Sequence, residues 1–258
     1  MRFRVCLAVC LLWLGLVACS GGGETAVSPT DSLLVAAASD LQFAFPEIGR
    51  AFEQHTGIPV TFTFGSSGNL TTQVENGAPF DVIATANVAF VNRLEEQGLI
   101  ESDTKVVYAQ GHLVLAVNRA AGLVVTSLED LRETAVTRVA IANPEHAPYG
   151  MAARQALQTS HIWDEIQDKI VFGENVRQTL QFVQTGDVPV GIISLSIANV
   201  PEITTIPISS ELHDPINQGM AVLKSAPHPE AARQFVAFVT GEHGQAILQQ
   251  YGFLTPEP

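Results

Sequence analysis

Hydrophobic and polar positions alternate along the chain, first with the period of a strand and then with that of a helix. The first such unit is an apolar strand over residues 33–38, followed by a helical pattern from Leu41 that ends at Gly57. Pro46 lies inside this pattern, so we expect a kink or two short helices there. Repeated strand and helix units predict an α/β fold with largely parallel sheets.

The same periodicity of hydrophobic positions predicts further strands and helices through most of the chain. Residues 105–117 form a long β-rich stretch that could cross between two lobes. No second apolar run is long enough to span a membrane. Strands are also predicted over 58–64, 80–84, 138–142, 171–173, 189–194 and 219–223, and helices around Leu70 and Val74 and over 88–97, 148–157, 174–183, 229–239 and 242–250.

The N-terminus has the composition of an export signal. Two arginines precede an apolar run over residues 5–17, and Leu16-Val17-Ala18-Cys19 matches the cleavage box of bacterial lipoproteins. We therefore predict a signal peptide over 1–18, lipidation at Cys19, and a flexible Gly- and Ser-rich tether over 19–30. The alternative is an ordinary secretory signal with an incidental cysteine.

Composition narrows the possible functions. All three cysteines lie in the first 19 residues, so we expect a mature chain without disulfides. The formal net charge is −13. Removal of residues 1–18 takes away two of the 13 basic residues and no acid, which leaves 11 against 26, or −15. A surface of this sign repels nucleic acid and anionic lipid.

Small polar residues occupy the loops that lead from predicted strands into predicted helices. In open α/β sheets, ligands bind at the carboxyl ends of strands. A helix N-terminus adds partial positive charge and unsatisfied N–H groups, so several directed at one point could hold a dianion. Taken singly, Ser39 is also an ordinary cap and Tyr149 an ordinary aromatic. The loops are Ser39-Asp40, Gly65-Ser66-Ser67-Gly68, Pro148-Tyr149-Gly150 and Glu174-Asn175-Val176, and only the last is followed by a cation, Arg177.

These segments resemble the molybdate-binding proteins of ABC importers. The similarity runs in one order over nearly all of the chain after the signal, and the Pro-Glu-His-Ala-Pro-Tyr-Gly sequence is its most specific part. The segments are Ala36-Ala37-Ala38-Ser39-Asp40, residues 64–70 with Asn76-Gly77-Ala78-Pro79, residues 143–150, Gly173-Glu174-Asn175-Val176 and the closing Tyr251-Gly252-Phe253.

The resemblance implies a two-lobed periplasmic-binding-protein fold of type II. Each lobe would be a mainly parallel sheet flanked by helices, with the ligand in the cleft between lobes and strands that cross as a hinge. Lobe 1 would comprise residues 31–112 and 216–258, and lobe 2 residues 113–215.

The resemblance also implies a set of anion-binding residues. Ser39 and Ser67 would each give a hydroxyl and a backbone N–H from lobe 1. Tyr149 and Val176 would give backbone N–H groups from lobe 2, so their side chains would matter little. Some family members place a tyrosine hydroxyl where this chain has Ser194, which is shorter; Ser196 or a backbone group could supply that fifth contact instead.

The function implied by the resemblance is high-affinity, extracytoplasmic capture of molybdate or tungstate and its delivery to an ABC permease and its ATPase. The protein would be a monomer in the periplasm or at the cell surface, held at the membrane by its lipid anchor alone. It would close around its ligand. No cofactor is expected, and molybdenum would be bound as the oxoanion, with no side chain coordinating the metal directly.

Other anions remain open on the residues alone. A donor-only site suits an oxoanion that is fully deprotonated, such as molybdate, tungstate or sulfate, whereas hydrogen phosphate favours a site with an acceptor. Asp40 and Glu174 are nearby acids, and at helix starts they are expected to cap or to face solvent. Sulfate differs mainly by its smaller size, so the preference for molybdate depends on the resemblance.

An exported hydrolase is the alternative from another class. Residues 65–68 are not the Gly-x-Ser-x-Gly turn of esterases, and neither a phosphate-binding loop nor a His-Glu-x-x-His sequence occurs. Glu145 and His146 are the one tempting acid and base pair, and the seven histidines show no metal spacing. We therefore predict a binding protein with no catalytic residues.

Overall fold

A computed structural model describes residues 32–256, in which two five-stranded sheets are formed. The first sheet has β1 parallel to β2 and to β3, whereas β10 is antiparallel to both β3 and β4. Four of its strands therefore point one way, and β10 is the exception. In spatial order the strands are β2 (Val60–Gly65), β1 (Leu33–Ala38), β3 (Val82–Thr85), β10 (Ile216–Val222) and β4 (Val106–Gly111).

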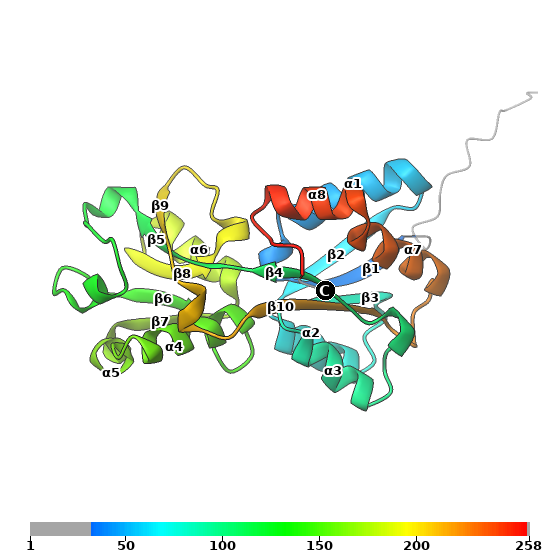
Figure 1. The fold of residues 1–258 in the computed structure, drawn as a ribbon, viewed down its shortest axis with the longest axis horizontal. Coiled ribbons are helices and arrows are strands. Elements are labelled where there is room, and N and C mark those ends of the chain that lie inside the picture. The colour runs from blue at the N-terminus through cyan, green and yellow to red at the C-terminus, as the bar shows by residue number, and fades with distance from the viewer. Residues whose placement is uncertain (1–31, 257–258) are drawn as a thin grey trace, which may run out of the picture. The chain divides into compact units, whose positions relative to one another are not determined.

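Helices cover both faces of this sheet, and together they form lobe 1. α1 (Ala44–Thr56), α7 (Pro229–Thr240) and α8 (Glu242–Gln250) lie on one face, and α2 (Ser67–Glu75) and α3 (Val88–Glu96) lie on the other (Figure 1). The apolar face of α1 packs Phe45 and Phe52 edge-on against Phe235 of α7, with ring centroids 6.1 and 5.4 Å apart. This aromatic contact fixes α1 and α7 to each other over the sheet.

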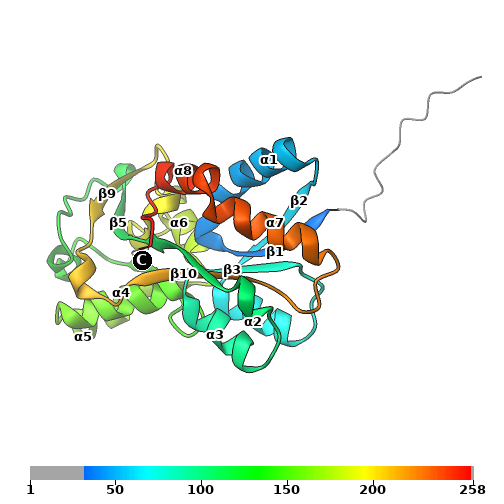
Figure 2. The same ribbon diagram turned by 45° about the vertical axis from the view of Figure 1, so that its right-hand side comes forward.

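The second sheet and its helices form lobe 2. β6 is parallel to β7 and β8, and β5 is antiparallel to β8 and β9. α4 (Pro148–Thr159) and the short α5 (Trp163–Ile166) lie on one side, with α6 (Val176–Thr185) on the other (Figure 2). In spatial order the strands are β7 (Ile170–Gly173), β6 (Val139–Ala142), β8 (Val190–Ser194), β5 (Leu113–Asn118) and β9 (Ile203–Pro207).

The chain passes between the lobes along its central strands. β4 belongs to the first sheet and β5 to the second, with only His112 between them, so the long β-rich stretch over 105–117 crosses between lobes as predicted. The return path runs from β9 to β10. This is the two-lobed α/β fold expected from the sequence, with one antiparallel strand inside each sheet.

Some local predictions needed refinement. The helical pattern that begins at Leu41 is divided into a 3-10 turn over Ser39–Leu41 and α1 from Ala44 onward. Pro46 is the third residue of α1, where its missing N–H breaks no intrahelical bond. α1 ends at Gly57 in the left-handed conformation (φ 77°), as its position predicts. β9 and α5 were not predicted, because their apolar patterns are short.

Most of the predictions that concern the membrane involve the N-terminal residues. The signal peptide, Cys19 and the tether lie outside the described residues. Within 32–256, no helix combines the length and the apolar character needed to cross a membrane.

Candidate anion-binding site

Four of the five predicted site residues line one small cavity. Ser39 and Ser67 reach it from lobe 1, and Tyr149 and Val176 reach it from lobe 2; all four are at least 96% buried. The empty volume is about 180 Å³. Among residues 32–256, no lysine, arginine or histidine lines this cavity. Its wall is completed by Ala38, Asp40, Gly65, Ser66, Ala86, Ala147 and Pro148.

The N-terminus of α2 leaves one backbone N–H available at the cavity. Ser66 is the N-cap, and its hydroxyl accepts from the N–H of Asn69 at 3.4 Å. The N–H of Gly68 donates to the carbonyl of His146 in lobe 2 at 2.9 Å. The first helical N–H, that of Ser67, has no intrahelical acceptor. The cap and the cross-lobe bond thus use the neighbouring donors and leave the one at Ser67.

The hydroxyl of Ser67 is also oriented as a donor. Its oxygen accepts the N–H of Ala86 at 2.9 Å, so the hydroxyl proton remains available for another acceptor. Ser39 follows β1 directly at the start of the 3-10 turn, and that turn has no side-chain cap. Both serines are therefore placed to donate hydroxyl protons into the cavity.

The N-terminus of α6 repeats the arrangement in lobe 2. Asn175 caps this helix, and its Oδ1 accepts from the N–H groups of Arg177 and Gln178 at 3.0 and 3.1 Å. Val176 is the first residue of the helix, so its N–H has no intrahelical acceptor. As in α2, the cap leaves the donor that borders the cavity.

The N-terminus of α4 also has backbone N–H groups without an acceptor, although no side chain caps this helix. Ala147 offers no side-chain acceptor, and Pro148 has no N–H to satisfy. Helical bonding begins with the N–H of Met151 and the carbonyl of Ala147 at 3.0 Å. The N–H groups of Tyr149 and Gly150 therefore have no intrahelical acceptor.

Ser194 does not line this cavity with the other four predicted residues, although its hydroxyl lies close to that of Tyr149. It is fully buried. Its hydroxyl lies 2.7 Å from the hydroxyl of Ser196, which in turn donates to the backbone carbonyl of Asp40 at 2.7 Å. In this arrangement Ser194 supports a contact between lobes, and its predicted role as a fifth anion contact stays a prediction.

Asp40 is the cavity residue whose role sequence reasoning missed. We expected it to cap a helix or to face solvent, but only 1% of it is exposed. Gln218 donates to its Oδ2, whereas its Oδ1 is buried without a hydrogen bond. Burial raises the pKa of this carboxyl to about 6, although Gln218 and the hydroxyl of Tyr149 act in the opposite direction. Glu174, by contrast, is exposed as expected.

The side chain of Tyr149 is also less interchangeable than the sequence suggested. Its hydroxyl lies 3.3 Å from Nε2 of Gln218. A Cβ atom at Gly111 would stand 2.0 Å from this hydroxyl, so the glycine at the end of β4 makes room for it. Tyr108 donates to the amide oxygen of Gln218 at 2.8 Å. The available signal was Gln218, which with Asn217 places two amides in a strand that is otherwise made of apolar residues and glycine.

Further contacts join the lobes around the cavity. Nδ1 of His146 lies 2.9 Å from the hydroxyl of Ser66. Asn69 donates to Glu174 across the lobes at 3.4 Å. The lobes are therefore in contact at the rim, which makes this the closed form of a cleft.

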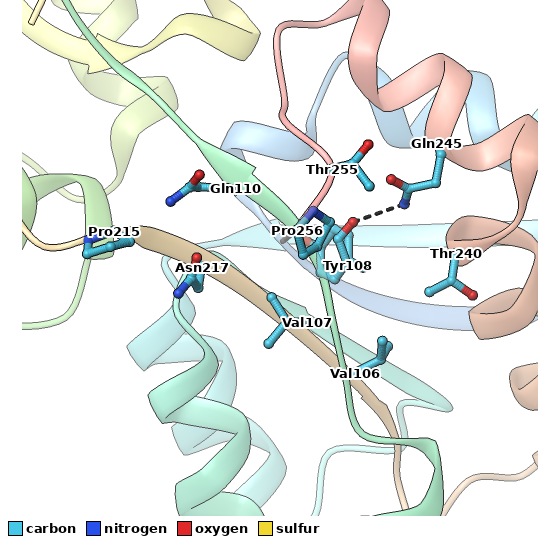
Figure 3. Close-up of a pocket in the computed structure, with 10 residues that line it drawn as sticks. All are labelled: Val106, Val107, Tyr108, Gln110, Pro215, Asn217, Thr240, Gln245, Thr255 and Pro256. Atoms are coloured by element: carbon cyan, nitrogen blue, oxygen red, sulfur yellow. Dashed lines mark hydrogen bonds between the residues drawn. The ribbon is translucent and has the colours of Figure 1, made fainter. Parts of the chain in front are cut away.

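A larger hollow lies elsewhere on the described residues. It has an empty volume of about 1170 Å³ and lies beside β4, β10 and the C-terminal segment. Figure 3 shows its lining side chains spread along the strands, with Gln245 bonded to the carbonyl of Tyr108 at 2.9 Å. Because no set of donors converges there, we place the candidate site in the smaller cavity.

A resident metal centre has no support in the described residues. No group of three or more His, Cys, Asp or Glu residues among residues 32–256 could hold a metal ion. The polar groups of the cavity are hydroxyls, backbone N–H groups and one carboxyl, which suit an anion better than a cation.

Comparison with known proteins agrees with this chemistry. Residues 33–254 match the family model described as bacterial extracellular solute-binding protein. The molybdate-binding protein ModA of Rhodobacter capsulatus is 30% identical over 86% of this chain and 88% of its own. The periplasmic molybdate-binding protein of Azotobacter vinelandii superposes with a TM-score of 0.82 at 28% identity, over 88% of this chain and 100% of its own.

A structure with lower sequence identity shows that the same fold occurs in a protein with a different ligand. The sulfate-binding protein SubI of Mycobacterium tuberculosis superposes with a TM-score of 0.74 at 17% identity, over 88% of each chain. Similarity at that level shows a common fold and leaves the ligand open. The family matches identify a binding protein and not an enzyme. The chain belongs to the bacterial extracellular solute-binding proteins, in the branch of the molybdate-binding proteins.

Proposed function

We propose that this protein captures molybdate or tungstate in the cavity between its lobes and delivers the anion to an ABC permease and its ATPase. The observation that carries this proposal is the convergence of Ser39, Ser67, Tyr149 and Val176 on a buried cavity with no cationic side chain. Helix N-termini supply partial positive charge there, so a dianion is held by dipoles and hydrogen bonds.

The choice among anions follows from donor chemistry and from relatedness. The free N–H and hydroxyl groups favour an oxoanion that carries no proton, whereas an ionised Asp40 would offer hydrogen phosphate an acceptor, so phosphate belongs in the binding test. Sulfate satisfies the same requirement, and its binding protein shares the fold at 17% identity. Molybdate is favoured because relatives that bind it are similar over most of the chain at about 30% identity.

The place of action is part of the same proposal. A signal peptide over residues 1–18 and acylation of Cys19 would hold the protein at the outer side of a membrane, with residues 19–30 as a tether. The protein would act there as a monomer. Mass spectrometry of the membrane-extracted protein tests the anchor, because two signals are expected: removal of 18 residues and a mass increase from acyl chains.

The binding test is isothermal titration calorimetry of the purified protein with molybdate, tungstate, sulfate and phosphate at one pH. We expect tight one-to-one binding of molybdate and tungstate, with sulfate and phosphate much weaker. Tight sulfate or phosphate binding would reassign the ligand, and no binding of any of the four would refute the proposal.

The same titration tests the assigned residues. Ser39→Ala and Ser67→Ala should each weaken molybdate binding by about 1 to 3 kcal/mol, because each removes a hydrogen bond to a charged group. Ser209→Ala is the matched control, since Ser209 is exposed and its hydroxyl only accepts the N–H of Glu211. Unchanged affinity in both cavity variants would contradict the site.

A further inference from the structure

Asp40 stands in the cavity wall without a counter-ion. Among the described residues it forms no salt bridge. Gln218 donates to its Oδ2, the hydroxyl of Tyr149 from α4 lies beside it, and Tyr108 from β4 is bonded to Gln218. α6 packs against the same 3-10 turn and contributes one cation, Arg177, which makes no ion pair with Asp40. A carboxylate at this place would thus be a buried, uncompensated charge.

The other elements that pack against the turn of Asp40 supply no counter-ion either. β2 and the 3-10 turn over Leu195–Ile197 also contact the turn of Asp40, and neither carries an ionisable side chain. Arg177 is directed toward the ring of Phe43, with 5.5 Å between the guanidinium carbon and the ring centroid. A dianion that enters the cavity therefore meets Asp40 in a water-poor space, where like charges repel strongly.

We propose that Asp40 binds the captured anion as a neutral acid and donates a hydrogen bond from Oδ1, so that binding of each dianion takes up one proton from the solvent. This inference rests on the proposed function, because it concerns the same cavity. It adds Asp40 to the anion-binding residues and makes capture depend on pH.

The geometry around Asp40 suits this role. Oδ2 already accepts from Gln218, so the proton belongs on Oδ1, the buried oxygen that has no partner. Protonation turns that unsatisfied acceptor into a donor. The carboxyl would then supply a contact beyond those of Ser39, Ser67, Tyr149 and Val176, whereas the hydroxyl of Ser194 lies against that of Ser196.

The free energy needed to protonate Asp40 at physiological pH is small. Burial holds the pKa of Asp40 at about 6 in the ligand-free protein, and a dianion beside it would raise this pKa further. Below about pH 6 the acid is already protonated and affinity should not change with pH. Above about pH 6, affinity should fall by about tenfold per pH unit, because each binding event must bring one proton with it.

The test is calorimetry with molybdate at pH 7.5 in two buffers of different ionisation enthalpy. The difference in observed enthalpy gives the number of protons taken up, which should approach one per anion. A pH series from 6 to 8 should show the fall in affinity in parallel. Molybdate is fully deprotonated throughout this range, so the anion itself does not supply the proton.

Two variants separate Asp40 in the cavity wall from His146, a titratable group at the rim. Asp40→Asn is neutral at every pH and offers an N–H donor, so it should bind molybdate without proton uptake and with a flat pH profile. His146→Gln is the matched control, because His146 lies against Ser66 at the lobe contact. This control should keep the proton uptake of the unmodified protein.

Each outcome has one meaning. Molybdate binding with no proton uptake in the unmodified protein would overturn the role of Asp40 and leave the proposed function standing. Uptake that disappears in His146→Gln and persists in Asp40→Asn would also overturn it. If neither molybdate nor tungstate binds at any pH, the proposed function fails instead. The buffer experiment on the unmodified protein remains decisive if Asp40→Asn does not fold.

Discussion

The two lobes present their donors to the cavity in different ways. In the proposed site, lobe 1 would contribute the hydroxyls of Ser39 and Ser67, whereas lobe 2 would contribute backbone N–H groups at Tyr149 and Val176. A hydroxyl can be removed by one ordinary substitution, but a backbone N–H is removed only by proline. The side chain of Val176 can therefore vary more freely than those of Ser39 and Ser67, whereas Tyr149 is restricted by the contacts of its hydroxyl with Gln218 and Gly111.

The helix caps explain why the backbone donors are available. In α2 the cap is Ser66, and in α6 it is Asn175, each of which accepts from N–H groups deeper in the first turn. The first N–H of each helix is left for the cavity. Ser66 differs from Asn175 in one respect, because it also contacts His146 in the other lobe.

The largest effect on binding is expected where the lobes meet. An added Cβ at Gly68 would stand 2.8 Å from Cβ of His146 and 2.9 Å from its carbonyl oxygen. Gly68→Ala should therefore hinder closure and weaken molybdate binding by about 3 kcal/mol, or roughly a hundredfold. The melting temperature without ligand should change little, since the contact is between lobes.

Gly150 provides the contrast within one lobe. A Cβ there would stand 2.1 Å from the carbonyl oxygen of Ala142, at the junction of β6 and α4. Gly150→Ala should lower the melting temperature of the ligand-free protein, which Gly68→Ala should not. Calorimetric melting of both variants would contradict this view if their ligand-free transitions shifted equally.

A proline in lobe 2 tests the backbone donor directly. Proline is well accepted at the first helical position, as at Pro148 in α4, and Asn175 before it is extended (φ −150°, ψ 174°), as that neighbour requires. Val176→Pro should keep the fold and lose one N–H, weakening molybdate binding by about 1 to 3 kcal/mol.

Val176→Ala is the control for this prediction. It removes most of the side chain and keeps the backbone N–H, so affinity should stay within about threefold, while the lost apolar burial lowers stability modestly. Titration of both variants decides the matter. Equal losses of affinity would show that the side chain of Val176, and not its N–H, matters for binding.

Much of the fold could be predicted from apolar spacing, because buried strands and amphipathic helices need it. The crossing stretch over 105–117 and the end of α1 at Gly57 are examples. Short elements such as β9 gave too few periods to detect.

The candidate site was predictable only in part, for a physical reason. Loops at the carboxyl ends of strands marked Ser39, Ser67 and Val176, because strand order brings such loops together. The burial of Asp40 depends on residues distant in sequence, above all on Gln218, 178 positions away. No local pattern records a contact of that kind.

The smallest expected effects separate the two caps. Asn175→Ala and Ser66→Ala should each destabilise the protein by about 1 kcal/mol, a fall of about 2 to 4 °C in melting temperature, because each leaves N–H groups in a first helical turn without an acceptor. Only Ser66→Ala should also weaken molybdate binding, by about threefold to tenfold, since Ser66 alone contacts the opposite lobe through His146. Thermal melting and titration of the two variants check both statements. Weaker binding in Asn175→Ala would mean that the cap of α6 positions the N–H of Val176, and lobe 2 would then depend on a side chain after all.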